Sequence, residues 1–413
     1  MADLAEICEG LGIENPIAVG MSRALDADPG DHLVRDAVGP PLTGLQAAGA
    51  IGVGINSLLV IGVMPALLGA LADEGRLSAA GIGQAATLEL LTMGAATAVV
   101  GMALKPRRLK LIGAAASLAL AGLDLATLAG SGPGLLALRA GAGAVEGVLL
   151  WITVSMIART LTPERWAGVF FTTQTLAQLL LAVALALWVM PRFGANGGFV
   201  ALAVASMLGL APALASPSAF APLPLAPGEG GAPPLRGWIA LVATLIYIAA
   251  VGAVSVYLQP LAHQAGLTTD IARTALWISL AAQVAGGAAA TALAGRVRYF
   301  TVFLLTSATY LGVWWVFSRH SPAWIFIAAN ASSGFMGLFL SPFLVPMTID
   351  ADPTRRSALQ SGAAQLLGGA AGPWLASLLV GERDVHAVLW LSAALLLSGL
   401  AIVAWLRFTA ARA

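Results

Sequence analysis

Uninterrupted runs of about 20 apolar residues recur along this chain from residue 45 to residue 407. An α-helix of about this length is needed to cross a hydrocarbon layer about 30 Å thick. Only 10% of the 413 residues are charged, and 59% are hydrophobic, which excludes an ordinary soluble domain. The sequence therefore predicts an all-α integral membrane protein.

Twelve such runs are present, and each predicts a helix, because the runs are long and continuous rather than short with alternating polarity. The first six lie at residues 45–72, 79–104, 109–130, 134–158, 166–190 and 196–216. The second six lie at residues 238–262, 271–294, 299–318, 322–348, 356–381 and 386–407. We therefore expect the chain to cross the membrane twelve times.

The residues outside these spans predict the orientation. Residues 1–44 form an acidic tail without the features of a secretory signal, and its Cys8 is the only cysteine, which excludes intramolecular disulfides and cysteine-rich metal sites. With this tail in the cytoplasm, thirteen lysines and arginines fall on the cytoplasmic side and five on the other. Basic residues accumulate in cytoplasmic loops. We therefore expect the tail and the C-terminal residues 408–413 to be cytoplasmic.

A segment rich in proline and glycine, residues 217–237, separates the sixth span from the seventh. Segments of this composition join two helical bundles without packing into either. We therefore expect an N-terminal six-helix bundle at residues 45–216, a cytoplasmic linker, and a C-terminal six-helix bundle at residues 238–407.

The two expected bundles carry matching landmarks at a constant offset of 190 residues. Arg108 falls on Arg298, and Arg165 falls on Arg355. A fixed spacing of this kind indicates an internal repeat. Because six spans, an even number, lie within this offset, the two copies would have the same orientation in the membrane. Parallel six-helix repeats with a site between them are typical of one class of secondary transporters.

The sequence resembles the major facilitator superfamily over all twelve spans. In that family a glycine and a cluster of acidic and basic residues lie between the second and third helices. The segment GMALKPRRLK, residues 101–110, matches the glycine and the basic residues, but Lys105 stands at the acidic position. The corresponding TALAGRVR of the second half, residues 291–298, keeps only the basic residues.

Two further motifs of that family lie in the fourth and fifth helices. Arg139 followed by Gly143 matches the arginine and glycine of the fourth helix. The glycine and proline pattern of antiporters is absent from the fifth span, and a similar GGAAGP lies in the eleventh, at residues 368–373. The resemblance implies two parallel pseudo-repeats of six helices, with a central cavity that the fourth helix lines.

Four strongly ionisable side chains lie inside the predicted spans, away from the helix ends: Glu89, Asp124, Arg139 and Glu146. Each costs about 2.5 to 3.5 kcal/mol at the bilayer centre, so each needs a partner or a function. Asp124 and Arg139 lie at equal depth in neighbouring spans, about 11 Å below the connecting turn. We predict a structural ion pair between them. The alternative for Arg139 is proton coupling, which the family resemblance implies.

Glu146 follows Arg139 by two helical turns on the same face, and Thr153 extends this stripe. Because the resemblance implies that the fourth helix lines the central cavity, we expect the stripe to face that cavity. If Asp124 neutralises Arg139, then Glu89 and Glu146 have no basic partner, and buried carboxyls of this kind bind protons near neutral pH or a cation. We predict that Glu146, with Arg139 and Glu89, serves proton coupling or substrate binding. The alternative for Glu146 is a buried, protonated packing position.

Uncharged polar and aromatic side chains are weaker candidates for the cavity, since helix–helix hydrogen bonding and packing also account for such residues. These candidates are Asn56, Trp151, Thr153, Gln174, Gln178, Tyr257, Gln259, Asn330, Ser333, Gln360, Gln365 and Trp374. Gly143 and Gly147 form a small-xxx-small pair, which predicts the close approach of a neighbouring helix.

The sequence therefore predicts a secondary transporter that moves a small organic solute by alternating access, with protons as coupling ion and no metal or other cofactor. The alternatives are an exporter of hydrophobic compounds and a transport-inactive receptor or scaffold. An enzyme is disfavoured because paired histidines, a phosphate-binding loop and a sizeable soluble domain are absent from the sequence. We expect a monomer in the bilayer of the bacterial cytoplasmic (inner) membrane, with no nucleic-acid partner.

Overall fold

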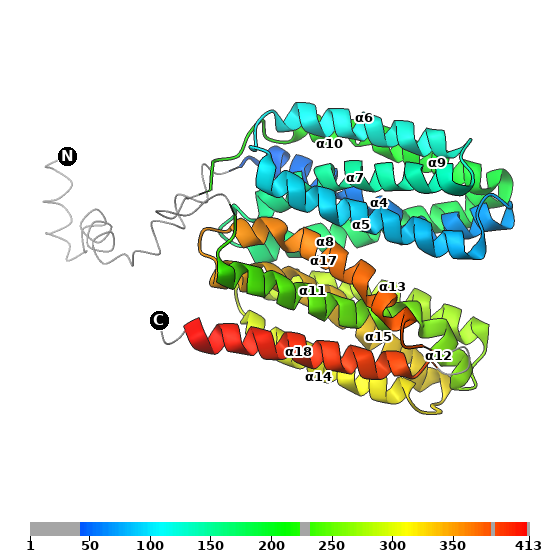
Figure 1. The fold of residues 1–413 in the computed structure, drawn as a ribbon. Helices are drawn as coiled ribbons and strands as arrows, with labels where there is room; N and C mark the ends of the chain where they lie inside the picture. The colour runs from blue at the N-terminus through cyan, green and yellow to red at the C-terminus, as the bar shows by residue number, and fades with distance from the viewer. Residues whose placement is uncertain (1–41, 224–231, 381–384, 411–413) are drawn as a thin grey trace, which may run out of the picture.

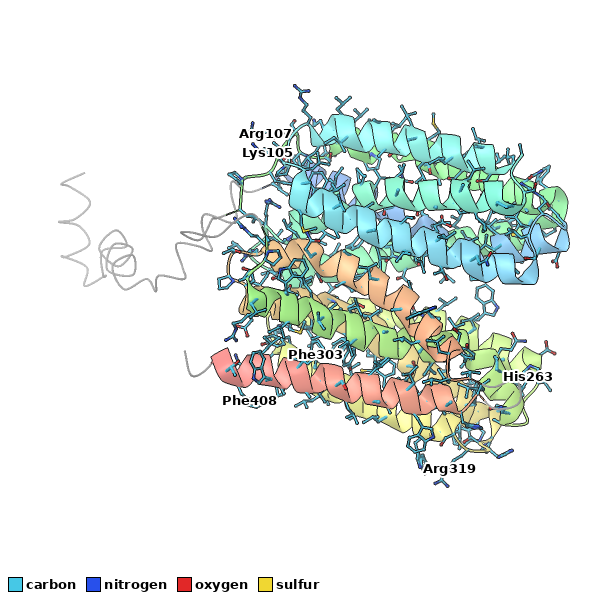
Figure 2. The ribbon with its side chains drawn as sticks, in the orientation of Figure 1. Lys105, Arg107, His263, Phe303, Arg319 and Phe408 are labelled. Atoms are coloured by element: carbon cyan, nitrogen blue, oxygen red, sulfur yellow. The ribbon has the colours of Figure 1, made fainter. Side chains whose placement is uncertain are left out.

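The computed structural model describes residues 42–223, 232–380 and 385–410, and within these ranges the regular structure is helical (Figure 1). The helices lie side by side in two groups, an upper and a lower one in this view. Figure 2 shows Lys105 and Arg107 at one end of the helices and His263 and Arg319 at the other. The end with Lys105 and Arg107 is called the basic end below.

The upper group is formed by residues before the predicted linker. Its helices are α4 (Gly44–Asp73), α5 (Ala79–Ala103), α6 (Leu109–Thr127), α7 (Gly132–Ile157), α8 (Pro163–Ala184), the π-helical turn η1 (Leu185–Val189), α9 (Met190–Leu208) and α10 (Leu210–Ala215).

The lower group is formed by residues after the predicted linker. Its helices are α11 (Leu235–Val256), α12 (Leu258–Gln264), α13 (Thr269–Leu293), α14 (Tyr299–Phe317), α15 (Ala323–Leu340), the 3₁₀ turn η2 (Ser341–Phe343), α16 (Leu344–Ala351), α17 (Arg356–Ser377) and α18 (Ala387–Ala410).

Each predicted span falls on one of these helices or on consecutive ones, which confirms the all-α membrane architecture. In the described chain 10 helical segments are long and apolar enough to cross a membrane. One of them, Pro163–Ala215, contains the fifth and sixth predicted spans and is broken at Gly194, where φ is 59°. The eleventh predicted span coincides with α17, which is not among the 10. The number of twelve crossings stays a prediction.

Four predicted spans are divided. The fifth contains the π-helical turn η1, and the sixth is split at Gly209, between α9 and α10. The seventh is split at Tyr257, between α11 and α12. The tenth is split by η2, which contains Pro342. Proline has no backbone N–H to donate within a helix, so a change of helix type is expected at this position. Hydropathy does not detect such breaks, because the residues on both sides are apolar.

The buried core is also organised by group. The largest cluster of buried apolar side chains lies entirely in the lower group, from Ala240 to Leu406. Two smaller clusters lie in the upper group, around Leu67 and Leu149. A further cluster joins the two groups, since Leu150 packs in it together with Leu359. Apolar packing therefore holds each group together and also connects them.

Helix α7 packs closely on α5 because two glycines of α7 face the backbone of α5. A Cβ atom at Gly143 would lie 2.2 Å from the carbonyl oxygen of Glu89, and one at Gly147 would lie 2.4 Å from that of Met93. The predicted close approach at this small-residue pair is confirmed. The lower group contains a similar close helix contact. A Cβ at Gly372 on α17 would lie 2.2 Å from the carbonyl oxygen of Ala249 on α11.

The start of the predicted linker packs against the upper group, so the expectation that residues 217–237 pack into neither bundle is wrong for this part. The backbone N–H of Phe220 donates to the carbonyl of Pro106 at 3.0 Å. The Arg159 side chain donates to the carbonyl of Ala221 at 2.9 Å and lies over the Phe220 ring. An aromatic ring with a cationic partner gains from this contact. Residues 224–231 and the predicted tail before residue 42 lie outside the described residues.

We predict that Gly143→Ala lowers the melting temperature of the purified protein in detergent. The added methyl would meet backbone, which cannot move aside as a side chain can, and overpacking of this kind costs about 1 to 3 kcal/mol. Gly141→Ala is the matched control, because a Cβ there would lie 3.5 Å from Leu123, an ordinary contact. Alanine is also the better helix former. Equal melting temperatures for the two variants would contradict the packing described here.

Candidate functional site

The charged residues predicted within the spans gather inside the upper group. Arg139 on α7 donates from Nε to Glu89 Oε2 of α5 at 3.0 Å, and its Nη2 pairs with the other Glu89 oxygen. Its Nη1 donates to Asp124 Oδ1 of α6 at 3.0 Å. All three side chains are almost fully buried. One guanidinium therefore serves two carboxylates, one of them in the bidentate arrangement that favours strong pairing.

Glu89 differs from the sequence-based expectation. The sequence left it without a basic partner, whereas the structure pairs it with Arg139. The reason is the close approach of α5 to α7 at Gly143, which carries Glu89 to the arginine. The Arg139 guanidinium also lies 5.3 Å from the ring centroid of Phe199 on α9. The charge of Arg139 is therefore compensated by two carboxylates and by an aromatic ring.

Glu146 is the remaining carboxyl of this buried region, and only 1% of its surface is exposed. Its Oε2 atom has no hydrogen-bond partner among the described residues. Its backbone carbonyl accepts a hydrogen bond from Ser57 of α4 at 2.8 Å. Arg139 is already paired with two carboxylates, and no ion pair of Glu146 is found among the described residues.

The stripe of Arg139, Glu146 and Thr153 faces the interior of the upper group and lines none of the cavities described below, which differs from the expectation. Thr153 Oγ1 donates to the carbonyl of Ala50 on α4 at 2.6 Å. A Cβ at Gly54 would lie 2.4 Å from that same hydroxyl. Small residues on α4 and α7 thus bring these helices together over the stripe and close it off.

A cavity of about 250 Å³ lies between the two groups. Helices α4, α7 and α8 line it from the upper group, and α13, α15, α16 and α17 line it from the lower group. Its polar lining consists of side-chain amides and hydroxyls, from Gln174, Thr175, Gln178, Gln283, Ser361 and Gln365. The rest is apolar and includes Phe170 and Phe171. None of the described residues that line this central cavity is ionisable.

A second cavity of about 340 Å³ lies within the lower group, among α11, α13, α14 and α15. It shares Gln283 and Leu338 with the central cavity, so the two are neighbours. Asn330 and Ser333 line it. The Asn330 side chain donates to the carbonyl of Ala275 at 2.9 Å, which fixes the orientation of this amide.

Some of the uncharged candidate residues line one of the two cavities, and the others line neither. Gln174, Gln178 and Gln365 line the central cavity, and Asn330 and Ser333 line the second one. The remaining candidates line neither: Asn56, Trp151, Thr153, Tyr257, Gln259, Gln360 and Trp374. Of these, Asn56 donates to Ser117 at 3.2 Å, and a Cβ at Gly101 would lie 2.7 Å from Gln360 Nε2, so these two amides serve helix packing.

The two tryptophan candidates, which the sequence suggests for the cavity, line neither of the two cavities. Trp151 is fully buried in the core of the upper group. Trp374 is 59% exposed. Gly372, two residues earlier on α17, faces α11, and two residues correspond to a rotation of about 200° around the helix. The residue at 374 is therefore directed away from the neighbouring helix.

Gln283 was not identified from the sequence, although it lines both cavities. The available signal was a single amide within an apolar run, ISLAAQVAGG, just before Gly286 and Gly287. A Cβ at Gly286 would lie 2.1 Å from the carbonyl oxygen of Phe335 on α15. The glycines fix the face of α13 that packs on α15, and Gln283 lies beside that contact.

A polar contact joins the groups at the basic end. Arg355, which has a φ of 62°, donates from Nη1 to the carbonyls of Ala158 at 2.9 Å and Thr160 at 2.6 Å, just after α7. Asp352 orders this loop by accepting hydrogen bonds from the backbone N–H groups of Thr354 and Ser357. Carbonyls at a helix C-terminus attract cations. Burial lowers the pKa of Arg355, and Glu164 opposes that shift.

The sequence matches no protein-family model and no curated protein. The structure is similar to that of the human organic anion transporter MFSD10 (TETRAN), with a TM-score of 0.63, 14% identity, and coverage of 91% of this chain and 100% of that one. It is similar to the major facilitator superfamily transporter FucP in the outward conformation, with a TM-score of 0.61, 14% identity, and coverage of 90% and 99%.

It is also similar to the proton:xylose symporter XylE bound to 6-bromo-6-deoxy-D-glucose, with a TM-score of 0.62, 13% identity, and coverage of 90% of this chain and 95% of that one. The fold is therefore that of the major facilitator superfamily, which confirms the resemblance noted in the sequence.

We predict that Arg139→Gln destabilises the protein by about 3 to 5 kcal/mol, because it leaves two buried carboxylates without their cation. Thermal or denaturant unfolding of the purified variant in detergent measures the loss. Arg319→Gln is the control, since this arginine lies over the exposed Trp315 ring at the opposite end. An Arg139→Gln protein as stable as the control would show that the cluster is not an ion-paired unit.

Proposed function

We propose that this protein, a chain with the major facilitator fold, is a secondary transporter that moves a small uncharged organic solute by alternating access and binds the coupling proton at Glu146. The observation that carries the proposal is the central cavity, which helices of both groups line together. A site of this kind between two repeats is the arrangement that alternating access requires.

The chemistry of the cavity supports an uncharged solute. Since no described lining residue is ionisable, a charged solute would lose its hydration without gaining a counter-charge, which is costly. Glutamine amides both donate and accept hydrogen bonds, so Gln174, Gln283 and Gln365 suit hydroxyl or amide groups. The proton symporters of similar fold transport xylose and fucose, which are uncharged sugars.

Glu146 supports proton coupling. An ionised carboxyl with an unpaired buried oxygen costs free energy, and a bound proton removes this cost. Leu150 and Val154 follow Glu146 on α7 and line the central cavity. A protonation change at Glu146 would therefore alter the packing of a helix that contacts the solute. Proton binding and solute binding would both shift the equilibrium between the two conformations.

Alternating access also requires that the cavity can be closed at one end. The hydrogen bonds from Arg355 to the end of α7 support such a closure at the basic end. The basic loops favour the cytoplasmic side for this end. In the proposed cycle these hydrogen bonds break when the cavity opens to the cytoplasm and form again when it opens to the other side.

An exporter of hydrophobic compounds with the same fold is the second candidate. The observation that favours it is the apolar part of the lining, in which Phe170 and Phe171 from α8 face Leu58 and Ile61 from α4. Such a transporter would bind apolar and aromatic compounds without requiring hydrogen-bonding groups on them.

A thermal-shift screen of the purified protein distinguishes these candidates, because a ligand that binds only the folded state raises the melting temperature. The screen includes sugars, uncharged aromatics, organic acids and cationic drugs, each at two pH values. We expect shifts from uncharged solutes with hydroxyl or amide groups, and smaller shifts in Gln174→Leu and Gln365→Leu. Shifts from apolar compounds that both variants retain would favour the exporter. Shifts from organic ions alone would contradict an uncharged substrate.

We predict that Glu146→Gln abolishes the pH dependence of uptake into proteoliposomes, measured with a solute identified in the screen. Glutamine is similar in shape to a protonated carboxyl but cannot release a proton. Asp73→Asn is the control, since it removes a carboxylate from an exposed position. Uptake by Glu146→Gln with the pH profile and rate of the unmodified protein would exclude Glu146 as the proton site.

We predict that Arg355→Gln opens the basic end more often, since it removes hydrogen bonds from a charged donor worth about 1.5 to 3 kcal/mol. The measurement is the rate at which a maleimide labels a cysteine placed at Ser361 in the central cavity, in a chain with Cys8→Ser. We expect faster labelling from the basic side. Arg107→Gln, at an exposed position of the same end, is the control. Equal labelling rates would exclude a closing role for Arg355.

A further inference from the structure

We propose that a crevice between α8 and α13 at the basic end binds a phosphate group, and that the phosphate belongs to an anionic membrane lipid. The crevice has a volume of about 490 Å³ and is separate from the two cavities described above. Arg165 of the upper group and Arg296 of the lower group both line it. A ligand in this place would therefore contact both groups at once.

The two arginines are available for a ligand. Both are exposed, and neither guanidinium has a hydrogen-bond or ion-pair partner among the described residues. A guanidinium donates in a planar fork that matches two oxygens of a phosphate. No carboxylate lines the crevice among the described residues. Glu164, beside Arg165 in the sequence, has its Oε1 atom 3.9 Å from the position of a Cβ at Gly295. Two cations beside one carboxylate leave the crevice with a net positive charge.

The remaining polar groups of the crevice are threonine hydroxyls. Thr172 donates to the carbonyl of Gly168 at 2.7 Å, and Thr291 donates to that of Gly287 at 2.9 Å. Their protons are used within their own helices, but their oxygen atoms remain able to accept. A ligand that brings both phosphate oxygens and hydroxyl donors satisfies the arginines and the threonines together. The phosphate and glycerol hydroxyls of phosphatidylglycerol have this combination.

The surface next to the crevice supports a lipid as the source of the phosphate. Leu176 and Leu180 lie four and eight residues after Thr172 on α8, on the same helical face. They are 43% and 62% exposed. In a membrane protein such side chains contact acyl chains, so a lipid with its phosphate in the crevice would place its tails along them. Basic pockets between helices on the cytoplasmic side bind anionic headgroups in this way.

Binding at this place would also affect the conformation. The helices touch directly beneath the crevice, since a Cβ at Gly168 would lie 2.4 Å from Thr291 Oγ1. A phosphate held by arginines of both groups adds a bridge at this contact and so favours the conformation closed at the basic end. This consequence rests on the proposed alternating access, whereas the binding of the phosphate does not.

The test is a thermal-shift titration of the purified full chain in detergent with phosphatidylglycerol, phosphatidylcholine, glycerol 1-phosphate or inorganic phosphate. The variants are Arg165→Gln/Arg296→Gln and the control Arg298→Gln, an exposed arginine two residues further along that does not line the crevice. A ligand that binds only the folded state stabilises it by RT ln(1 + [L]/Kd). The melting temperature measured over a range of ligand concentrations therefore reports the apparent affinity, and no transported solute needs to be known.

We expect stabilisation by phosphatidylglycerol beyond that of phosphatidylcholine, with about tenfold weaker apparent affinity in the double variant because two charge-assisted contacts are lost. The Arg298→Gln control keeps the full affinity. If glycerol 1-phosphate or inorganic phosphate stabilises the protein, and the double variant loses this effect, the crevice binds phosphate but does not require a lipid. Equal shifts from both lipids without a phosphate effect, or an undiminished shift in a folded double variant, would overturn the proposal.

Discussion

A single buried guanidinium organises the upper group of helices. Arg139 on α7 is paired with Glu89 on α5 and with Asp124 on α6, so three helices meet at one charge. In a low-dielectric interior such pairing is strong, and breaking it is costly. Because the arginine has no further charge to offer, Glu146 remains as a carboxyl without a cation. The arrangement thus contains a paired cluster and one buried carboxyl outside it, which is the group proposed to bind the coupling proton.

This cluster needs helices that lie very close together, and glycines make that possible. Gly143 and Gly147 bring α5 onto α7, as Gly372 brings α11 onto α17. The close contact of α4 with α7 at Gly54 and Thr153 shuts the charged stripe off from the central cavity. The glutamines of α8, α13 and α17 give the central cavity a polar but uncharged lining. The buried charges and the central cavity therefore occupy different parts of one structure, and α7 contributes residues to both.

The sequence predicts those features that depend only on the position of a residue along its helix. Hydropathy predicted the spans, and equal depth in a hairpin predicted that Asp124 could reach Arg139, which the structure places in contact. Depth could not predict the pairing of Glu89, because the rotation of α5 about its axis depends on contacts with a helix distant in the chain. For the same reason the sequence does not predict the exposure of Trp374 or the place of Gln283 in the cavity lining, because the faces of their helices are fixed by glycines that pack on α11 and α15. The rotation of a helix about its own axis cannot be predicted from composition alone.

The two cavities meet at Gln283 and Leu338, side chains that belong to both linings. Leucine and glutamine change rotamer far faster than helices move. The boundary between the two cavities therefore consists of side chains, which can change conformation without a movement of the helices. Under the proposed transport function, a compact solute would occupy one cavity, and a longer one would displace these two side chains and extend into the next. The molecular length that this protein tolerates would then be set by two flexible residues rather than by the spacing of its helices.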